Sequence, residues 1–391
     1  MTATKSSLQV IGPDGARPFM RGILVQSLTS RGVPFDVAVD VSNAVRDEVA
    51  QLGDVELQEL ARLAEKHLPD KYDLEAVPLR PHAVPTVTFA RGEPAPFSKG
   101  ILANSLQGAG LDPNDAYEVA RELEAEMLRE GVREIDRIAL RDRVAVTIDN
   151  YHGPKAAGRY RTWRAAAEDG KPIFLLLGGS TGVGKTSIAV DVARRLEIPH
   201  VIGTDSIRQI MRLMFSRDLL PEIHSSTYDA HESRELGGLQ GDRVIPAFRE
   251  QAQKIAVGVH ALLDRAVEEN YSMMIEGVNV VPGLLDLDRY KGRAHVILLV
   301  VAGLNEKTYR SRFQGRADQV RQRAAERYLE HFDDILAIQD HVLSECEVHG
   351  TQIIDNVNLE SAVLSVIRSV IASLSASLPR TARTAEGKSP S

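Results

Sequence analysis

One stretch decides the fold of this chain: Gly179-Ser180-Thr181-Gly182-Val183-Gly184-Lys185-Thr186. It has the spacing G-x-x-x-x-G-K-[ST] and lies between an apolar run, residues 173–177, and an amphipathic segment that begins at Ser187. In such a loop, successive backbone N–H groups form an anion nest at a helix N-terminus, the lysine adds a mobile positive charge, and the hydroxyl can ligate Mg²⁺. A turn without a ligand would need the glycines but not Lys185 or Thr186. Residues 179–187 therefore predict a nucleoside triphosphate site.

Composition limits the class of protein. The chain has 391 residues, 43% of them hydrophobic, which allows a substantial core and two or three domains. A formal net charge of -7 argues against a general nucleic-acid binder, whose affinity rests on a basic surface. The single cysteine, Cys346, excludes an internal disulfide and fits a reducing compartment. No apolar run approaches the roughly 18 residues of a membrane span, so we expect a cytoplasmic protein without nucleic-acid or membrane partners.

The front of the chain contains an internal repeat. Residues 18–28 and 96–106 share Pro-Phe, then a basic residue, then Gly-Ile-Leu and Ser-Leu. The elements expected in the two copies are strands at residues 8–11 and 86–90, helices from Phe19 and Phe97, and helices at residues 35–50, 55–67, 113–131 and 132–148. We therefore predict two small hairpin-plus-helices modules, residues 1–80 and 81–165, joined by a proline-bearing linker.

Both copies resemble the ATP-cone, a regulatory nucleotide-binding module of about this size. The resemblance rests on the Gly-Ile-Leu helix after Arg21 or Lys99, on the glycine-bearing hairpin before it, and on the closing segment Arg159-Tyr160-Arg161-Thr162-Trp163-Arg164. Residues 12–15 lack the basic residues that such a hairpin usually carries, and the second hairpin has one, Arg91. Two roles stay open for the modules: nucleotide binding, or a scaffold for an interface such as that of a homo-oligomer.

From Lys171 the pattern changes to apolar runs separated by segments of helix length. These runs are residues 173–177, 200–202, 272–275, 295–301 and 351–354. Runs with so little polar interruption indicate a parallel sheet covered by helices on both faces. The predicted fold class is α/β: a P-loop kinase core with a five-stranded parallel sheet at residues 166–374, preceded by the two mainly helical modules. Residues 375–391, rich in Ser, Ala and Thr, are expected to form a disordered tail.

Ligands of such a sheet lie outside the carboxyl ends of its strands, so polar residues that follow the runs are site candidates. Asp205 follows the second run and could accept a proton from a substrate hydroxyl or orient Mg²⁺. The alternative is that Asp205 or Thr204 caps the next helix. Glu276 ends the third run, where an acid can orient Mg²⁺ through water and face the substrate. A solvent-facing acid at a strand end would give the same pattern.

Arginines are concentrated after the fourth run, in an otherwise acidic protein. We expect Arg310 and Arg316 to close over the triphosphate, where fixed cations offset the charge that develops on the transferring group. Plain surface charge is the alternative for any one of these arginines.

A long insert between the second and third runs is the expected acceptor-binding element. Arg208, Ser225 and Ser226 suit a small phosphorylated or carboxylated metabolite, because arginine pairs bidentately with both groups. No set of His, Cys and Asp has the ligand spacing of a structural metal site.

Several of these segments together resemble the 2-phosphoglycerate kinase family: the P-loop, residues 203–208, His224-Ser225-Ser226 and above all residues 251–282. The family also carries an ATP-cone-like front part. The resemblance implies transfer of the ATP γ-phosphoryl group to 2-phosphoglycerate, giving 2,3-bisphosphoglycerate. The same homology group includes plant P-loop proteins connected with phytic acid accumulation, so the acceptor stays open. This chain departs from the family in its doubled front module and in Asn279, where a histidine is expected.

Taken together, the residues predict an ATP- and Mg²⁺-dependent small-molecule kinase. Lys185 would contact the β- and γ-phosphates, and Thr186 would ligate Mg²⁺. Asp205 would act as the base or orient the metal, while Arg208 would bind the acceptor. Two alternatives remain: a kinase for a nucleoside or an inositol phosphate, and a non-catalytic ATP sensor. The carboxylates at the strand ends, which binding alone does not require, favour catalysis.

Overall fold

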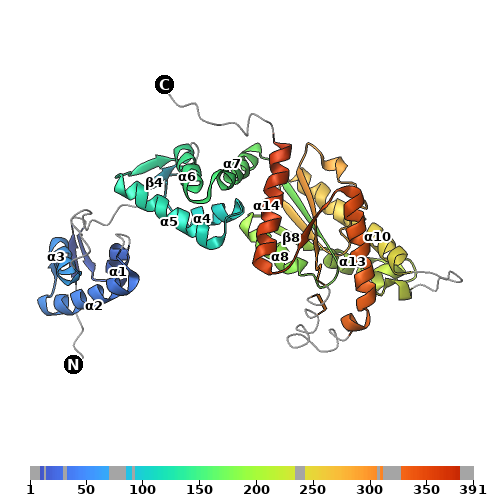
Figure 1. Ribbon diagram of the computed structural model, residues 1–391, viewed down its shortest axis with the longest axis horizontal. Coiled ribbons are helices and arrows are strands. Elements are labelled where there is room, and N and C mark those ends of the chain that lie inside the picture. The colour runs from blue at the N-terminus through green and yellow to red at the C-terminus, as the bar shows by residue number, and fades with distance from the viewer. Residues whose placement is uncertain are drawn as a thin grey trace, which may run out of the picture. The chain divides into compact units, whose positions relative to one another are not determined.

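The chain forms two compact units, one of residues 1–97 and 122–140 and the other of residues 98–121 and 141–391 (Figure 1). The computed structural model describes residues 9–12, 15–29, 33–69, 85–89, 93–233, 243–305, 309–310 and 327–378. Arg316 and the tail beyond Leu378 lie outside the described residues.

The first module of the repeat is built on a small sheet. β1 (Gln9–Gly12) pairs antiparallel with β2 (Gly15–Pro18) and parallel with β3 (Val55–Glu56). The module also contains three helices, α1 (Arg21–Thr29), α2 (Phe35–Leu52) and α3 (Leu57–His67). These helices supply buried side chains of its core, such as Leu28 and Val45. The helix expected from Val55 therefore begins two residues later, because the β-branched Val55 pairs with Val10 in the sheet.

The second copy repeats this strand order. β4 (Thr86–Thr88) pairs antiparallel with β5 (Ala95–Pro96) and parallel with β6 (Glu134–Asp136). Its helices are α4 (Lys99–Gly108), α5 (Pro113–Arg129) and α6 (Arg137–His152). The helix expected from Val132 begins only at Arg137, where Asp136 Oδ1 accepts hydrogen bonds from the backbone N–H groups of Ile138 and Ala139.

Helix α7 (Pro154–Asp169) contains the closing segment of the second module and packs against α14 (Leu359–Ser377). Trp163 on α7 contacts the core of the unit, and a Cβ on Gly108 would lie 3.1 Å from its Nε1. The boundary expected between residues 165 and 166 therefore falls inside a helix. Helix α14 also continues past residue 375, where the tail was expected to begin, because Leu378 is still buried.

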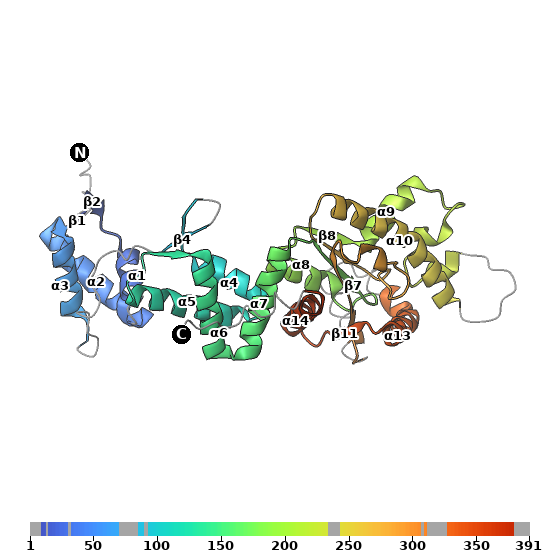
Figure 2. The same ribbon diagram turned by 90° about the horizontal axis from the view of Figure 1, so that it is seen from above.

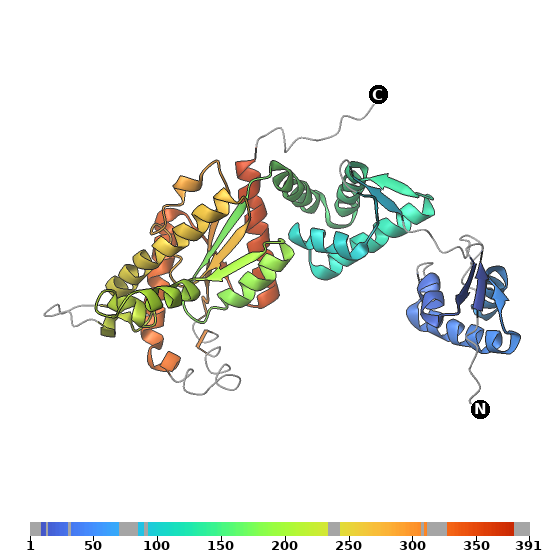
Figure 3. The ribbon, with the colours of Figure 1, turned by 180° about the vertical axis from the view of Figure 1, so that it is seen from behind.

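In the part of the chain that the structure describes, five parallel strands form the large sheet, which confirms the predicted fold class (Figure 3). The strands are β7 (Ile173–Gly178), β8 (His200–Gly203), β9 (Met273–Glu276), β10 (His295–Ala302) and β11 (Gln352–Asp355). Their order is β11-β10-β7-β9-β8, so β7 lies in the centre and all its residues are buried.

Helices cover both faces of this sheet, as Figure 2 shows. Leu175 and Leu177 pack into one core with α8 (Lys185–Arg195), α13 (Phe332–His349) and α14. Phe174 and Leu176 pack into the other core with α9 (Thr204–Met214) and α10 (Val244–Glu268). Because alternate residues of β7 meet apolar side chains on both faces, its sequence shows an unbroken apolar run.

One helix of this core, α14, is long and apolar enough to cross a membrane by length and composition. Its Val363, Val366 and Val370 are fully buried against the sheet core. Cys346 on α13 lies in the same core, where burial raises the pKa of its thiol to about 11. A thiol with a raised pKa is a poor nucleophile, so Cys346 has a packing role.

Gly258 on α10 sets how closely α9 can approach. A Cβ on Gly258 would lie 2.4 Å from Ile207 Cγ2, so we expect Gly258→Ala to destabilise the unit by about 1–3 kcal/mol through overpacking. Gly158→Ala on α7 is the matched control: a Cβ there has no atom within 4 Å, and the change is expected to stabilise by up to about 1 kcal/mol. Urea unfolding followed by the fluorescence of the single tryptophan, Trp163, measures both. Equal midpoints for the two variants would contradict the prediction.

Candidate active site

The P-loop connects the end of β7 to the start of α8 at Lys185. Gly179 has φ of 133°, and a Cβ there would lie 2.1 Å from the backbone oxygen of Val301. Gly184 has φ of 90°, and a Cβ there would lie 2.6 Å from Asn356 Nδ2. Only glycine fits at these two positions, which lets the main chain fold tightly against β10 and the end of β11. The loop thus presents backbone N–H groups at a helix N-terminus, as an anion site requires.

Two side chains from outside the motif hold the P-loop in this shape. Asn356 is buried just after β11, and its Nδ2 donates a hydrogen bond to the backbone oxygen of Val183 at 2.7 Å. Tyr309 is also buried, and its hydroxyl donates to the backbone oxygen of Thr181. Neither contact was predicted from the sequence. The available signal for Asn356 was the polar pair Asp355-Asn356 directly after the fifth apolar run.

Lys185 lies inside the curve of the loop. Its side chain is buried, and Nζ donates a hydrogen bond to the backbone oxygen of Ser180 at 2.7 Å. This contact keeps the ammonium group beside the loop, where a phosphate oxygen would meet both the positive charge and the backbone N–H groups.

Thr186, in the first turn of α8, and Glu276, the last residue of β9, are hydrogen-bonded to each other. Thr186 Oγ1 donates to Glu276 Oε1 at 3.0 Å. They come together because β9 lies next to β7, so their carboxyl ends share one edge of the sheet. Two ligands at right angles on one Mg²⁺, each about 2.0–2.1 Å from the ion, lie about 2.9 Å apart. The hydroxyl and the carboxylate therefore have both the chemistry and the spacing that this ion requires.

These residues line a cavity of about 160 Å³. Its lining comprises Thr181, Gly182, Gly184, Lys185, Thr186, Ser187, Thr204, Asp205, Glu276, Gly277, Val278 and Tyr328. The structure thus brings most of the predicted triphosphate site together with both predicted carboxylates. Gly179, Ser180 and Val183 shape the loop from behind and are not part of this lining.

Asp205 lies in the first turn of α9, and Arg208 follows three residues later on the same helix. Arg208 Nη2 donates to Asp205 Oδ1 at 2.9 Å, and Arg208 Nη1 donates to the backbone oxygen of Ser225 at 2.7 Å. The N-cap of α9 is Gly203, and within the described residues no side chain caps it. The alternative role of Asp205 or Thr204 as a helix cap is therefore not what the structure shows. Asp205 is instead 77% exposed and paired with Arg208, whose side chain is 14% exposed.

A second cavity has a volume of about 380 Å³, and Arg208 is part of its lining. It is lined by Arg208, Arg212, Arg217, His224, Ser225, Ser226, Asp229, Glu232 and Arg327. The predicted acceptor residues Ser225 and Ser226 are among them, and the concentration of guanidinium groups suits an anion. Arg327 also pairs with Asp229, and this carboxylate raises the pKa of the Arg327 guanidinium. Arg208 thus contacts a residue of each cavity, Asp205 in the first and Ser225 in the second.

A buried polar relay lies behind the second cavity. Asn279 Nδ2 donates to Gln251 Oε1 at 3.1 Å, and Gln251 Nε2 donates to the backbone oxygens of Glu222 at 2.7 Å and Ser225 at 3.3 Å. Asn279 is 2% exposed and lines neither cavity. Asn279, where a histidine was expected, is thus connected to the backbone of Ser225 through Gln251. Sequence reasoning did not assign a role to Gln251.

The two arginines predicted to close over the triphosphate have different outcomes. The guanidinium of Arg310 lies 4.4 Å from the ring centre of Phe332, and Arg310 is not among the described residues that line either cavity. Arg316 lies outside the described residues. Their role over the triphosphate stays a prediction.

Comparison with known proteins assigns the family. The chain is 38% identical over 268 residues to the 2-phosphoglycerate kinase of Methanocaldococcus jannaschii, covering 68% of this chain and 85% of that protein. It is 34% identical over 277 residues to the 2-phosphoglycerate kinase of Pyrococcus furiosus, covering 71% and 89%. The chain belongs to the 2-phosphoglycerate kinase family. It is therefore a phosphotransferase that uses ATP, as the sequence predicted. No family model matches the chain.

Solved kinase structures are more distant. A gluconokinase from Sinorhizobium meliloti is 14% identical with a TM-score of 0.26, covering 52% of this chain and 93% of that one. A shikimate kinase from Bacteroides thetaiotaomicron is 13% identical with a TM-score of 0.28, covering 50% and 97%. The fold assignment rests on the sheet order and the P-loop, not on these scores.

The contact between Asn356 and the P-loop predicts a role in nucleotide binding. Asn356→Ala removes the hydrogen bond to Val183 and is expected to weaken ATP binding about tenfold, which corresponds to the roughly 1.4 kcal/mol of one buried hydrogen bond. Asn358→Ala is the matched control. It removes the N-cap bond to Ser361 at 2.9 Å and should cost about 1 kcal/mol of stability without changing the ATP Kd. Calorimetric titration with ATP decides, and an unchanged Kd in Asn356→Ala would refute the role.

Proposed function

We propose that this chain transfers the γ-phosphoryl group of ATP to 2-phosphoglycerate or a closely related phosphorylated hydroxy acid. The observation that carries the proposal is the position of Arg208 between the two cavities. Arg208 donates hydrogen bonds to Asp205, which lines the P-loop cavity, and to the backbone oxygen of Ser225, which lines the second cavity. A kinase needs two adjoining sites, one for the triphosphate and one for the acceptor. The name of the relatives, 2-phosphoglycerate kinase, supports the choice of acceptor.

The second cavity supports a small acceptor with two anionic groups. Its volume of about 380 Å³ suits a metabolite of this size. The guanidinium groups of Arg208, Arg212 and Arg217 can each take a phosphate or a carboxylate through two parallel hydrogen bonds. 2-Phosphoglycerate carries both of these groups beside one free hydroxyl, so one end can be held by arginines while the hydroxyl faces the triphosphate.

In the proposed reaction, the acceptor hydroxyl oxygen bonds to the γ-phosphorus while the bond from that phosphorus to the β–γ bridging oxygen breaks. ADP leaves with the electron pair of the broken bond, and the hydroxyl proton goes to the Asp205 carboxylate. Lys185 offsets the negative charge on the phosphates, and the P-loop N–H groups keep the γ-phosphoryl group in line with the acceptor. Most of the rate comes from this positioning and charge compensation.

Thr186 and Glu276 would hold Mg²⁺ at the edge of the P-loop cavity. Their oxygens are 3.0 Å apart, and hydroxyl and carboxylate oxygens are the donors that Mg²⁺ prefers. When bound, Mg²⁺ neutralises charge on the β- and γ-phosphate oxygens. Glu276 has a second function in this arrangement, since it fixes the rotamer of the Thr186 side chain.

An acceptor screen that follows ADP release tests the proposed function. With wild-type protein and ATP, 2-phosphoglycerate is expected to give a kcat/KM at least about tenfold above that of glycerate, which lacks the phosphate and loses a charge-assisted contact. Arg208→Ala should lower kcat/KM for 2-phosphoglycerate about a hundredfold, by loss of about 3 kcal/mol of binding and positioning.

Arg194→Ala is the matched control for this screen, because Arg194 is an exposed arginine paired only with Asp191 among the contacts of the described residues. It should leave kcat/KM unchanged. Lys185→Ala and Asp205→Asn should abolish transfer if the P-loop and the carboxylate act as proposed. Turnover of an inositol phosphate or a nucleoside in preference to 2-phosphoglycerate would replace the acceptor, and ATP binding without any ADP release would reject the kinase.

A magnesium titration tests Glu276. Glu276→Gln keeps the size of the side chain and its hydrogen bond to Thr186 but removes the negative charge. We expect kcat at saturating ATP to fall about 10²- to 10³-fold, and the Mg²⁺ concentration for half-maximal rate to rise. Glu268→Gln, at an exposed position at the end of α10, is the control and should behave as wild type. The same Mg²⁺ dependence in both variants would remove Glu276 from the metal site.

A further inference from the structure

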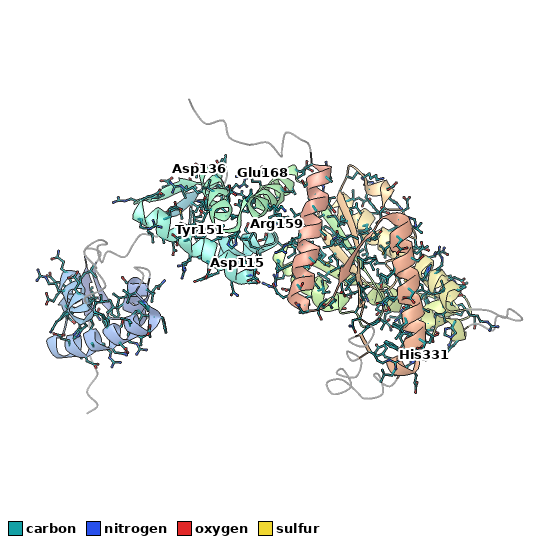
Figure 4. The ribbon with its side chains drawn as sticks, viewed as in Figure 1. Asp115, Asp136, Tyr151, Arg159, Glu168 and His331 are labelled. Carbon is teal, nitrogen blue, oxygen red and sulfur yellow. The ribbon has the colours of Figure 1, made fainter. Side chains whose placement is uncertain are left out.

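Three side chains from two distant segments lie close together at the second cavity, and two of them, Asp229 and Glu232, line it. Asp229 directly precedes the 3-10 turn η2 (Ala230–Ser233), and Glu232 lies within it. His331, labelled in Figure 4, is the N-cap of α13. One ligand atom from each lies within 4.8 Å of the other two. Asp229 and Glu232 also line the cavity that holds Arg208 and Arg212.

The two carboxylate oxygens of Asp229 differ in their hydrogen bonding. The residue is 2% exposed, and its Oδ2 accepts a hydrogen bond from Arg327. Its Oδ1 is buried and has no hydrogen-bond partner within the part of the chain that the structure describes. A buried, unpaired carboxylate oxygen costs free energy, and most such oxygens in proteins have a partner. A cation at Oδ1 would supply one while Arg327 keeps Oδ2.

His331 is oriented as a metal ligand would be. Its Nδ1 lies 3.2 Å from Asp334 Oδ2, which favours the tautomer with the proton on Nδ1 and leaves the Nε2 lone pair available. Nε2 faces Glu232 Oε1 at 4.0 Å, too far for a hydrogen bond. Two ligands of one tetrahedral ion, each about 2.1 Å from it, lie about 3.4 Å apart, so the exposed Glu232 side chain would move slightly closer to His331 to share the ion. The ring packs against Tyr228, with 5.3 Å between centroids, which restricts its rotation.

We propose that Asp229, Glu232 and His331 bind a divalent first-row transition cation, with Zn²⁺ as its representative, in the wall of the acceptor cavity. Two carboxylates and an imidazole are a donor set that such ions take, and the imidazole selects against Mg²⁺. Three protein ligands leave a coordination position open toward the cavity. Glu232 is 58% exposed on its side chain, so it can turn inward to complete the set.

A bound cation would change the charge of the cavity wall that an acceptor meets. Without a cation, Asp229 and Glu232 would repel an anionic acceptor from the wall that the arginines make attractive. With the cation bound, the same wall attracts an acceptor oxygen, which fills the open position. This last step rests on the proposed function, whereas the binding of the cation does not.

Calorimetric titration with Zn²⁺ tests the site directly. The tag-free full chain is stripped with a chelator, exchanged into chelator-free buffer and titrated in the absence of nucleotide and acceptor. We expect wild-type protein to bind Zn²⁺ at a site that Glu232→Gln and His331→Gln each weaken by at least about tenfold. Glu232 is exposed, so its replacement leaves the fold intact, which circular dichroism verifies.

Two controls locate the ion. Glu330→Gln changes an exposed carboxylate beside His331, and Thr186→Ala removes the hydroxyl of the P-loop cavity. Both should bind Zn²⁺ as wild type does. Equal binding by wild type and by Glu232→Gln, or loss of binding in Thr186→Ala, overturns the proposal.

A second titration separates the metal site from the proposed function. With free Zn²⁺ buffered at a fixed concentration and no ATP, 2-phosphoglycerate should tighten Zn²⁺ binding at least about fivefold, since two ligands that bind together favour each other reciprocally. A Zn²⁺ affinity that does not change with 2-phosphoglycerate would refute the contact between the ion and the acceptor. It would not contradict the metal site itself. Failure of the kinase assay would not alter the first titration.

Discussion

The structure depends on the close packing of the P-loop main chain against the ends of β10 and β11. Val301 O lies where a side chain on Gly179 would have to be, and the amide of Asn356 occupies the corresponding place beside Gly184. This packing turns the loop's N–H groups toward the cavity and starts α8 at Lys185. Everything else in the site is then set by strand order, because β9 beside β7 brings Glu276 to Thr186.

Most of the fold could be predicted from local patterns in the sequence. The elements that were not predicted share one cause. The five apolar runs predicted the large sheet because strands buried on both faces carry unbroken apolar sequence. β3 and β6 were missed because strands of two or three residues are too short to show a period of two. They exist because Val55 and Ile135 pair with strands that lie far away in the sequence. Such nonlocal pairing leaves no local signal.

The same distinction applies to the site. The P-loop and the position of Glu276 near it could be predicted, since parallel strands place their carboxyl ends at one edge and the motif spacing marks the loop. Arg208 and Ser225 were both assigned to the acceptor-binding element, but the hydrogen bond between Arg208 and the backbone of Ser225 was not predicted. Asn356 could not be assigned its contact with Val183, because 173 positions separate the two residues. The Asn279–Gln251 relay and the approach of His331 to Glu232 likewise depend on how helices pack on the sheet. Position after an apolar run marks Asn356 as a candidate, but the local sequence does not indicate the partners in any of these contacts.

The bond between Arg208 and Asp205 explains how one residue pair can serve two cavities. Arg208 uses Nη1 on the backbone of Ser225 and Nη2 and Nε on Asp205, so both sides of its guanidinium are engaged. In the proposed function, an acceptor anion in the second cavity would compete with Asp205 for these donors, and a phosphate would be the stronger partner because it carries more negative charge than a carboxylate. Once Arg208 turns to the acceptor, the exposed Asp205 carboxylate is left to accept the proton of the acceptor hydroxyl. Acceptor binding would thus free the Asp205 carboxylate to act as the base. With ATP alone, Asp205 would remain hydrogen-bonded to Arg208.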